Sequence, residues 1–336
     1  MEAPPWEVKR ELIIKDEEET NPSYGRLPTN RTIGDHIKYG IINLDKPSGP
    51  TSHEVVAWVK RILKVERAGH GGTLDPKVTG VLPIALEEAT KVVQTLLLSG
   101  KEYVCVMRLH ANVPSERVTQ IMEEFVGEIY QRPPLRSSVR RDIRKRRIYY
   151  IKDFEFQENR VLFRIGCQAG TYIRKICFDI GEALGCGAHM EELRRTRTGP
   201  FTEDESLVTL YDLYDAYDLW INEKDESPLR RIIKPMEEAP KLLPKIQIRD
   251  SAVDSICHGA DLAVPGILRL ESGIRPRELV GLFTLKDELI ALARATMSTE
   301  EIMKRDHGIA ADTLRVVMAP GTYPRMWQTG KAEGTR

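Results

Sequence analysis

The chain reads GHGGTLDP from Gly69 to Pro76 and continues into the apolar run VLPIAL at Val81–Leu86. Glycines in such a stretch let the backbone approach a ligand closely and adopt positive φ angles. Pro76 stiffens the turn and disfavours the α region at the residue before it, which is Asp75. Gly, Asp and Pro are also ordinary residues of surface turns. We expect a loop with one carboxylate at its tip, which suits a nucleophile or a ligand group.

Length and composition indicate an ordinary globular protein. The 336 residues are enough for more than one domain with a substantial core. Hydrophobic residues make up 41% and charged residues 30%, and no apolar run approaches the roughly 20 residues that span a bilayer. The N-terminus is acidic, with Glu2, Glu7 and Glu11, and lacks the features of a signal peptide. We expect a cytoplasmic protein that does not associate with membranes.

Cysteine and histidine residues show neither disulfide nor metal-site spacing. The five cysteines contain no C-x-x-C pair, and the seven histidines contain no H-x-x-x-H pair. Several of the cysteines lie inside apolar patterns, where a thiol behaves as a small hydrophobic group. We therefore expect no disulfide framework and no protein-bound metal.

Basic residues are concentrated locally, although the 50 basic and 50 acidic residues of the chain cancel. Residues 132–147 contain a single acidic residue, Asp142, and are followed by Tyr149-Tyr150. A second cluster is found at residues 194–197. The basic residues of the first segment are Arg132, Arg136, Arg140, Arg141, Arg144, Lys145, Arg146 and Arg147, and those of the second are Arg194, Arg195 and Arg197. Arginine-rich segments near aromatics are typical of contacts with phosphates and stacked bases. We expect a nucleic-acid partner and a mobile loop at residues 132–147.

Periodic patterns predict both helices and strands around the glycine-rich loop. Thr51 and Glu54 form a capping box at the start of a helix. Alternation from Tyr103 to Leu109 predicts a strand with Tyr103 at one end. A second helix begins near Thr171 and ends at Gly185.

Arg174 lies in the first turn of this second helix. The helix dipole offers a cation no stabilisation there, because the N-terminus carries its positive end. We therefore expect Arg174 to have a specific anionic partner. The alternative is an exposed arginine that extends into solvent.

The C-terminal third has a different pattern. Pro235, Pro240 and Pro244 mark a linker, and short strands follow it. Leu279–Leu285 and Leu289–Ala295 read as a hairpin joined at Lys286-Asp287-Glu288. A small β-barrel of about 80 residues would leave few exposed strand edges.

Together these motifs resemble those of the TruB-type pseudouridine synthases, in the order in which that family has them. Gly69–Pro76 resembles the H-x-G-x-L-D-P loop of the family, and its doubled glycine is similar to the dyskerin branch. The other matching motifs are Asn43–Pro47 with Thr51–His53, Lys101–Tyr103, Gly170–Arg174 and Leu193–Phe201. The length, without lysine-rich tails, is similar to the archaeal members of this branch, which are the synthases of H/ACA guide ribonucleoproteins.

The resemblance implies an α+β fold with distinct regions. It implies a catalytic domain at residues 39–244, with a mixed, largely antiparallel sheet and flanking helices. A C-terminal β-barrel PUA domain, which binds RNA, follows at residues 245–325. Residues 1–38 would form an N-terminal extension that packs on the PUA domain, and residues 326–336 a tail.

The resemblance also implies that the chain isomerises uridine to pseudouridine in ribosomal RNA, directed by an H/ACA guide RNA and assisted by three small ribonucleoprotein subunits. Isomerisation involves no net redox change, so no cofactor is expected. Stand-alone relatives act on the TΨC arm of transfer RNA, and a non-catalytic RNA scaffold is a further alternative. A scaffold predicts damage at Asp75, Tyr103 or Arg174, and all of them are intact. A metal-dependent hydrolase would need further ligands near Asp75, and none has ligand spacing.

Roles for individual residues follow from the same resemblance. Asp75 would be the catalytic carboxylate, acting at C1′ or C6 or in removal of the C2′ proton. Arg174 would pair with it inside a desolvated pocket. Tyr103 would stack on the target base and could also act on the C2′ proton. Tyr172 would pack below it, while His70 fills the gap left by the flipped nucleotide. The remaining expected site residues are Leu193 at the pocket wall, Lys46 and Pro47 as supports of the loop, and Gly259 and Asp261 as RNA contacts, together with the basic residues of 132–147.

Overall fold

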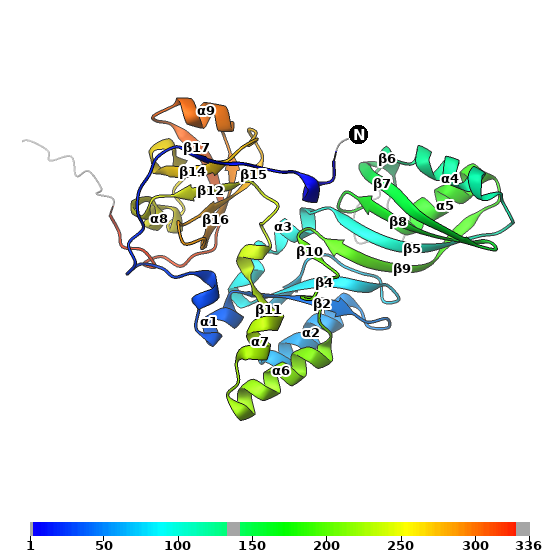
Figure 1. Ribbon diagram of the computed structural model, residues 1–336, viewed down its shortest axis with the longest axis horizontal. Coiled ribbons are helices and arrows are strands. Elements are labelled where there is room, and N and C mark those ends of the chain that lie inside the picture. Colours follow the sequence, from blue (N-terminus) through cyan, green and yellow to red (C-terminus); the bar gives the residue numbers. More distant parts are fainter. Residues whose placement is uncertain (1–2, 133–141, 327–336) are drawn as a thin grey trace, which may run out of the picture. The chain divides into compact units, whose positions relative to one another are not determined.

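The computed structural model describes residues 3–132 and 142–326. The chain divides into two compact units, labelled in Figure 1 by their helices and strands. Unit 1 contains Ile41–Glu87 and Val93–Lys234 together with the N-terminal residues up to Val8. Unit 2 contains Lys9–Gly40, Glu88–Val92 and the chain from Pro235 onward.

Unit 1 is built on a curled sheet that has ten strands within the described residues. The strand order is β11-β2-β4-β9-β5-β8-β7-β6, with β3 on β4 and β10 on β9. β4 and β9 run parallel, and the other registered pairs are antiparallel, so the predicted mixed, largely antiparallel sheet is confirmed. The strands are β2 (Gly40–Lys46), β3 (Ala68–His70), β4 (Thr79–Leu86), β5 (Lys101–Leu109), β6 (Gly127–Gln131), β7 (Arg144–Gln157), β8 (Arg160–Cys167), β9 (Ala188–Thr198), β10 (Phe201–Thr202) and β11 (Ile233–Pro235).

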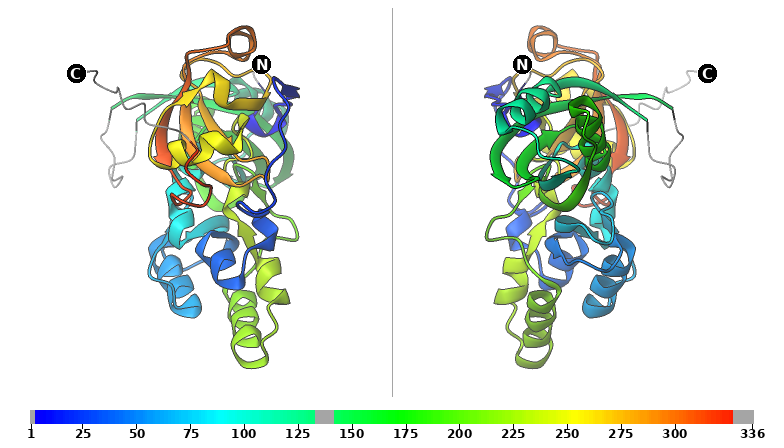
Figure 2. Two further views of the ribbon diagram at one scale, coloured as in Figure 1. Left: turned by 90° about the vertical axis from the view of Figure 1, so that its left-hand side faces the viewer. Right: turned by 90° about the vertical axis from the view of Figure 1, so that its right-hand side faces the viewer.

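Helices flank this sheet. They are α2 (Ser52–Leu63), α3 (Val93–Leu98), α4 (Ser115–Glu124), α5 (Ile173–Leu184), α6 (Leu210–Glu223) and α7 (Ser227–Ile232). Thr51 and Glu54 form the predicted capping box at the start of α2, which buries Val55, Val59 and Leu63. α4 and α5 lie side by side, as the right-hand view of Figure 2 shows.

α5 carries Arg174 and approaches β9 very closely. A Cβ atom on Gly181 would lie 2.1 Å from the backbone nitrogen of Ala188, so only glycine permits this approach. The helix ends at Gly185, whose φ of 75° is left-handed, as the sequence predicts. The contact at Gly181 therefore fixes how the C-terminal half of α5 meets the start of β9.

The expectation of a mobile loop is wrong for the second half of the basic segment. Arg144–Arg147 begin strand β7 and pair in register with Glu128–Gln131 of β6. The residues Arg136, Arg140 and Arg141 lie outside the described part of the chain. Charge density alone therefore does not distinguish a loop from a strand whose neighbour supplies an acidic partner.

Unit 2 is β-rich, as predicted. Its curled sheet has the order β1-β14-β12-β15-β16-β17-β13, with β12 and β15 parallel and the other registered pairs antiparallel. The β15–β16 hairpin is confirmed, although its connection is longer than expected and runs through residues 284–288. The elements are β1 (Leu12–Ile14), β12 (Lys245–Ile248), β13 (Leu262–Ala263), β14 (Ile267–Glu271), β15 (Leu279–Phe283), β16 (Leu289–Ala295) and β17 (Ile309–Val316), with α1 (Ile33–Lys38), α8 (Asp250–Cys257) and α9 (Thr299–Lys304).

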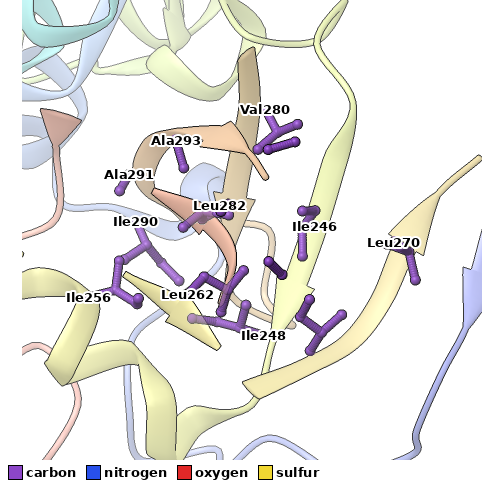
Figure 3. Packing of buried hydrophobic residues seen from close by; sticks show 14 of the residues in the cluster. Ile246, Ile248, Ile256, Leu262, Leu270, Val280, Leu282, Ile290, Ala291 and Ala293 are labelled. Atoms are coloured by element: carbon purple, nitrogen blue, oxygen red, sulfur yellow. The ribbon is translucent and has the colours of Figure 1, made fainter. Parts of the chain in front are cut away.

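The core of unit 2 consists mainly of aliphatic side chains from these strands and from α8. Figure 3 shows Ile246, Leu262, Val280, Leu282 and Ile290 among its members. The N-terminal strand β1 pairs antiparallel with β14, and Ile13 packs against this core. Among the described residues, no helix is both long and apolar enough to cross a membrane.

Two helical glycines predict opposite effects of the same substitution. Gly34→Ala in α1 adds a methyl group where no atom lies within 4 Å, so we expect a stability gain of up to about 1 kcal/mol from helix propensity. Gly181→Ala in α5 gains the same propensity but collides with the backbone of β9, and we expect a net loss of about 1–3 kcal/mol. Thermal unfolding of both variants checks this, and a Gly181→Ala protein as stable as the wild type would contradict the close approach of α5.

Candidate active site

The loop that carries Asp75 connects β3 with β4. Gly72 has a φ of 136°, a conformation that L side chains rarely adopt. The carbonyl of Asp75 accepts a hydrogen bond from the Val78 nitrogen at 3.0 Å, which closes a turn beyond the carboxylate. The sequence thus positions Asp75 in a turn at the glycine-rich segment, as expected.

Lys46, at the end of β2, holds the far side of this loop. Its Nζ donates hydrogen bonds to the carbonyl oxygens of Pro47, Pro76 and Val78, each at 2.9 Å. The side chain is fully buried. An ammonium has three N–H donors, so these carbonyls satisfy all of them. Lys46 therefore links the turn after β2 to the turn that follows Asp75.

Ser52 and Arg195 hold the near side of the loop. Ser52 Oγ accepts from the Leu74 nitrogen at 2.9 Å and donates to the Leu74 carbonyl at 3.2 Å, directly before Asp75. Arg195, on β9, donates from Nη2 to the Gly72 carbonyl at 3.0 Å and from Nε to the Val81 carbonyl at 2.8 Å. The loop is therefore fixed through its backbone at both ends.

The buried cations repel one another, and Asp75 partly offsets this. Burial and the nearby Arg195 lower the pKa of Lys46, while the charge of Asp75 raises it. Burial also lowers the pKa of Arg195, which the neighbouring Tyr103 opposes. The region around the loop therefore favours an anion.

Arg174 Nη2 donates to Asp75 Oδ2, which gives Arg174 the anionic partner predicted from its position. Arg174 is the second residue of α5, so the pair connects the loop to the N-terminus of that helix. The side chains are 58% and 55% exposed, so the expectation of a desolvated pocket is wrong for the chain alone. An exposed pair of this kind contributes only about 0–1 kcal/mol to stability. Its effect is to orient the carboxylate.

Tyr103 lies on β5 beside Arg195 of β9 and is almost fully buried. Burial raises the pKa of its hydroxyl, and Arg195, which hydrogen-bonds it, opposes that shift. The charge of Asp75 also raises the pKa of Tyr103. The phenol is therefore a neutral group near pH 7.

His70 ends β3 and faces His53 edge-on, with ring centroids 5.2 Å apart. Burial, followed by the charges of His53 and Arg195, lowers the pKa of His70 to about 4. Its Nδ1 accepts a hydrogen bond from the Gly72 nitrogen at 3.3 Å. Nδ1 of His70 must be unprotonated to accept this bond. His70 is therefore a neutral side chain near pH 7.

The other predicted site residues lie on different elements of the two units. Tyr172 is the N-cap of α5, two residues before Arg174. Leu193 is half-buried on β9 and pairs with Cys105 of β5. Gly259 and Asp261 belong to unit 2, where Asp261 Oδ1 accepts from the Thr313 nitrogen at 2.8 Å.

The side chains of the two basic clusters are less available for contacts with phosphate than the sequence suggested. In the first, Lys145 and Arg147 both pair with Glu128, at 2.8 and 3.3 Å. Arg146 donates from Nε to the Gly170 carbonyl at 3.2 Å.

In the second cluster, the interpretation as a phosphate-binding surface is wrong. Arg194 forms two hydrogen bonds to Asp45, at 3.0 and 2.9 Å, and also pairs with Glu203. Arg195 is buried against the loop, and Arg197 lies over the Trp6 ring at 5.1 Å. In a strand, neighbouring side chains point to opposite faces, so a run of arginines is not one surface.

Sequence reasoning missed several groups that shape the site. Ser52 and Arg195 are the clearest examples, because each binds the loop backbone. Lys101 is another buried cation: its Nζ donates to the carbonyls of Leu96, Leu97 and Ser99 at 2.8, 3.1 and 2.7 Å. Burial and Arg195 lower the pKa of Lys101 to about 7. The alternation of β9 could have placed Arg195 on one face, but no local signal gives its carbonyl partners.

The assembled geometry is a half-exposed carboxylate on a turn that is fixed through its backbone, and a guanidinium holds the carboxylate. Such a carboxylate can attack an electrophilic carbon or stabilise positive charge on a sugar. Within residues 3–132 and 142–326, no three or more His, Cys, Asp or Glu side chains are grouped to hold a metal ion.

Four protein-family models match the chain in succession. The DKCLD (NUC011) domain matches residues 4–56, the TruB family pseudouridylate synthase N-terminal domain matches 60–117 and 110–173, the tRNA pseudouridylate synthase B C-terminal domain matches 174–240, and the PUA domain matches 244–317.

Whole proteins and solved structures are similar along nearly the whole chain. A relative from Methanopyrus kandleri, named probable tRNA pseudouridine synthase B, is 60% identical over 96% of this chain and 95% of its own length. A chain in the crystal structure of a Cbf5-Nop10-Gar1 complex is 57% identical, with a TM-score of 0.93, over 96% of this chain and 98% of that one. A chain in the structure of an H/ACA RNP bound to a substrate RNA containing 2′-deoxyuridine is 55% identical, with a TM-score of 0.91, over 97% and 100%.

The low pKa of His70 predicts a loss of stability in mild acid. An unfolded histidine with a pKa near 6.5 binds a proton that the folded His70, with a pKa of about 4, does not bind. Stability should therefore fall as the pH drops through this window. His70→Asn should make the stability depend less steeply on pH in this window. The unfolding midpoint at several pH values measures this dependence. An imidazole of His70 that titrates near pH 6.5 by NMR would contradict the assignment of a neutral, partly buried side chain.

Proposed function

We propose that Asp75 is the catalytic carboxylate of this chain, which belongs to the TruB family of pseudouridine synthases. The family isomerises uridine to pseudouridine, and the chain is an RNA pseudouridine synthase. The observation that supports Asp75 in this role is its contact with Arg174 at the N-terminus of α5. The carboxylate is held in place and still half exposed, as a group that must meet a substrate requires.

The reaction breaks the bond between N1 of uracil and C1′ of ribose, turns the base, and rejoins it through C5. The C5 proton leaves as N1 gains one, so atoms and electrons balance without a cofactor. Asp75 would assist by adding to C1′ or to C6, or by promoting loss of the C2′ proton.

Neighbouring side chains have supporting roles in this proposal. Arg174 orients the carboxylate and balances its charge. We assign Tyr103 to stacking on the target base; because its ring is almost fully buried in the chain alone, this contact requires neighbouring side chains to move. Tyr172 packs below it at the start of α5. A base inside a helix is unreachable until it is flipped, and the neutral ring of His70 suits the space that the nucleotide leaves. Leu193 lines the pocket, while Lys46 and Pro47 hold the loop.

Contacts with RNA outside the pocket are assigned to two regions. We assign phosphate contacts to the basic residues 132–147, of which Arg136, Arg140 and Arg141 lie outside the described chain. Because Glu128 pairs with Lys145 and Arg147, their release to phosphate would require breaking these ion pairs. Gly259 and Asp261 are assigned to RNA contacts of the PUA domain.

The domain division proposed from the sequence stays at residues 1–38, 39–244, 245–325 and 326–336. The pairing of β1 with β14 supports an N-terminal extension that packs on the PUA domain. Most of the proposed tail lies outside the described residues. We also propose a cytoplasmic location, where an archaeal-type enzyme meets ribosomal RNA.

The similar structures support a guided enzyme. They contain H/ACA RNP and Cbf5-Nop10-Gar1 assemblies, and the match to this chain extends over nearly its full length. We therefore propose that this chain modifies ribosomal RNA with an H/ACA guide RNA and three small protein subunits, two of them like Nop10 and Gar1. The name of the Methanopyrus kandleri relative favours a second candidate, stand-alone modification of transfer RNA.

One assay distinguishes the two candidates. The purified chain is given a transfer RNA with a TΨC arm, and separately a ribosomal RNA fragment with its guide, each with and without the small subunits. We expect efficient conversion of the ribosomal target only when guide and subunits are present. Equal or faster conversion of the transfer RNA by the chain alone would contradict the guided assignment.

Asp75→Asn tests the catalytic role directly. The amide keeps the shape of the side chain but loses its charge, so we expect the rate of pseudouridine formation to fall about 1,000-fold or more, equivalent to about 4 kcal/mol of activation free energy. RNA binding should change little. Tritium release from RNA labelled at C5 of uridine measures the rate.

A matched control is Asp153→Asn. Asp153 is also an exposed aspartate of unit 1, 57% exposed, and it pairs with Arg164 at 2.9 Å. This variant should retain wild-type turnover. Turnover by Asp75→Asn equal to that of Asp153→Asn would remove Asp75 from the catalytic role.

A further inference from the structure

The N-terminus of α5 lacks a cap from its own sequence. Tyr172 occupies the N-cap position, and its side chain makes no capping hydrogen bond. Ser, Thr, Asp and Asn are the residues that normally provide one. The first turn of α5, which includes Arg174, therefore needs another support.

Gln131, the last residue of β6, provides that support through the backbone of Tyr172. Its Oε1 accepts from the Tyr172 nitrogen at 3.0 Å, and its Nε2 donates to the Tyr172 carbonyl at 3.2 Å. Gln131 is 3% exposed, so little water competes for these bonds. A primary amide can donate and accept at once, and both atoms of the amide are used here.

The carbonyl of Tyr172 also starts the helix. It accepts from the nitrogens of Lys175 and Ile176, at 3.1 and 3.2 Å, so it is the acceptor on which the first turn of α5 is built. The amide of Gln131 therefore fixes the same peptide groups that fix the helical turn. Arg174, which meets Asp75, lies inside this turn.

We propose that Gln131 is a positioning residue for the reaction, which holds the first turn of α5 so that the Arg174 guanidinium meets the Asp75 carboxylate. This inference rests on the proposed role of Asp75. Gln131 acts through Tyr172 and Arg174, and its effect on the reaction is an effect on their placement. A misplacement of about 1 Å at a reacting group can cost about 100-fold in rate.

Gln131→Leu removes both hydrogen bonds at similar volume. We expect the single-turnover rate to fall about 10-fold or more, with the dissociation constant for substrate RNA changed by less than about twofold. Both are measured in the assembly that supports wild-type turnover. A wild-type rate, or a loss of RNA binding that accounts for the whole loss of activity, would overturn the proposal.

Gln131→Glu keeps the shape of the side chain. If Gln131 positions Arg174, this variant should change the pH dependence of the rate, which a purely structural role would not do. An ionised carboxylate accepts from the Tyr172 nitrogen but repels the Tyr172 carbonyl, whereas a protonated one donates to it. Burial raises the pKa of such a carboxyl, so protonation occurs in mild acid. We expect the ratio of the Gln131→Glu rate to the wild-type rate to rise as the pH is lowered from about 8 to about 5.5. A flat ratio would overturn the proposal even if Gln131→Leu fails to fold.

The control makes the same amide-to-acid change elsewhere in unit 1. Asn159 Nδ2 donates to the Leu109 carbonyl at 2.9 Å, at the other end of β5 from Tyr103. Asn159→Asp should show a rate and a pH profile like those of the wild type. The two proposals fail differently: an active Asp75→Asn variant removes the catalytic assignment, while an inactive Asp75→Asn with a fully active Gln131→Leu removes only the role of Gln131.

Discussion

The position of the proposed catalytic carboxylate depends on buried cations that donate to backbone carbonyls. Lys46 binds the carbonyls of Pro47, Pro76 and Val78, and Arg195 binds those of Gly72 and Val81. Burying a charge is costly unless its hydrogen bonds are made, so these contacts define the geometry of the loop narrowly. The loop has no regular secondary structure, but buried side chains fix its backbone through these hydrogen bonds.

In this arrangement, the residues that stabilise the loop differ from the residues proposed to contact the substrate. The cations that hold the loop are buried, whereas the Asp75–Arg174 pair is about half exposed and adds little to the free energy of folding. The pair is therefore free to contact a substrate without disrupting its supports. The same division applies to α5, where Gly181 fixes the contact with the start of β9 and Gln131 holds the first turn of the helix.

Features that depend on local sequence were predicted well. The capping box of α2, the strand that begins before Tyr103 and the helix that carries Arg174 follow from spacing within a few residues of the chain. The anionic partner of Arg174 was predicted from the unfavourable position of a cation at a helix N-terminus. The interactions that determine these features act between residues close together in the sequence, so the sequence pattern is sufficient to predict them.

Features that depend on tertiary partners were not predictable. The cluster that includes Arg194 and Arg195 read as a phosphate-binding surface, yet Asp45 and backbone carbonyls far away in the chain are its partners. Gln131 gives no signal in the sequence, because its significance comes from a peptide group 41 residues later. A desolvated environment was expected for Asp75, yet its side chain is 55% exposed in the chain alone. In the proposed reaction the RNA itself would cover this site.

A structure of the assembled enzyme with a substrate RNA that carries 5-fluorouridine at the target position would show whether Asp75 acts on the target nucleotide. We expect the target nucleotide to be flipped out of its helix, with an Asp75 oxygen about 3–3.5 Å from C1′, C6 or C2′ of that nucleotide, or bonded to C1′ or C6. Arg174 should still contact the carboxylate. A well-ordered target nucleotide whose sugar and base lie beyond the reach of Asp75, with another side chain against C1′ and C6, would contradict the account.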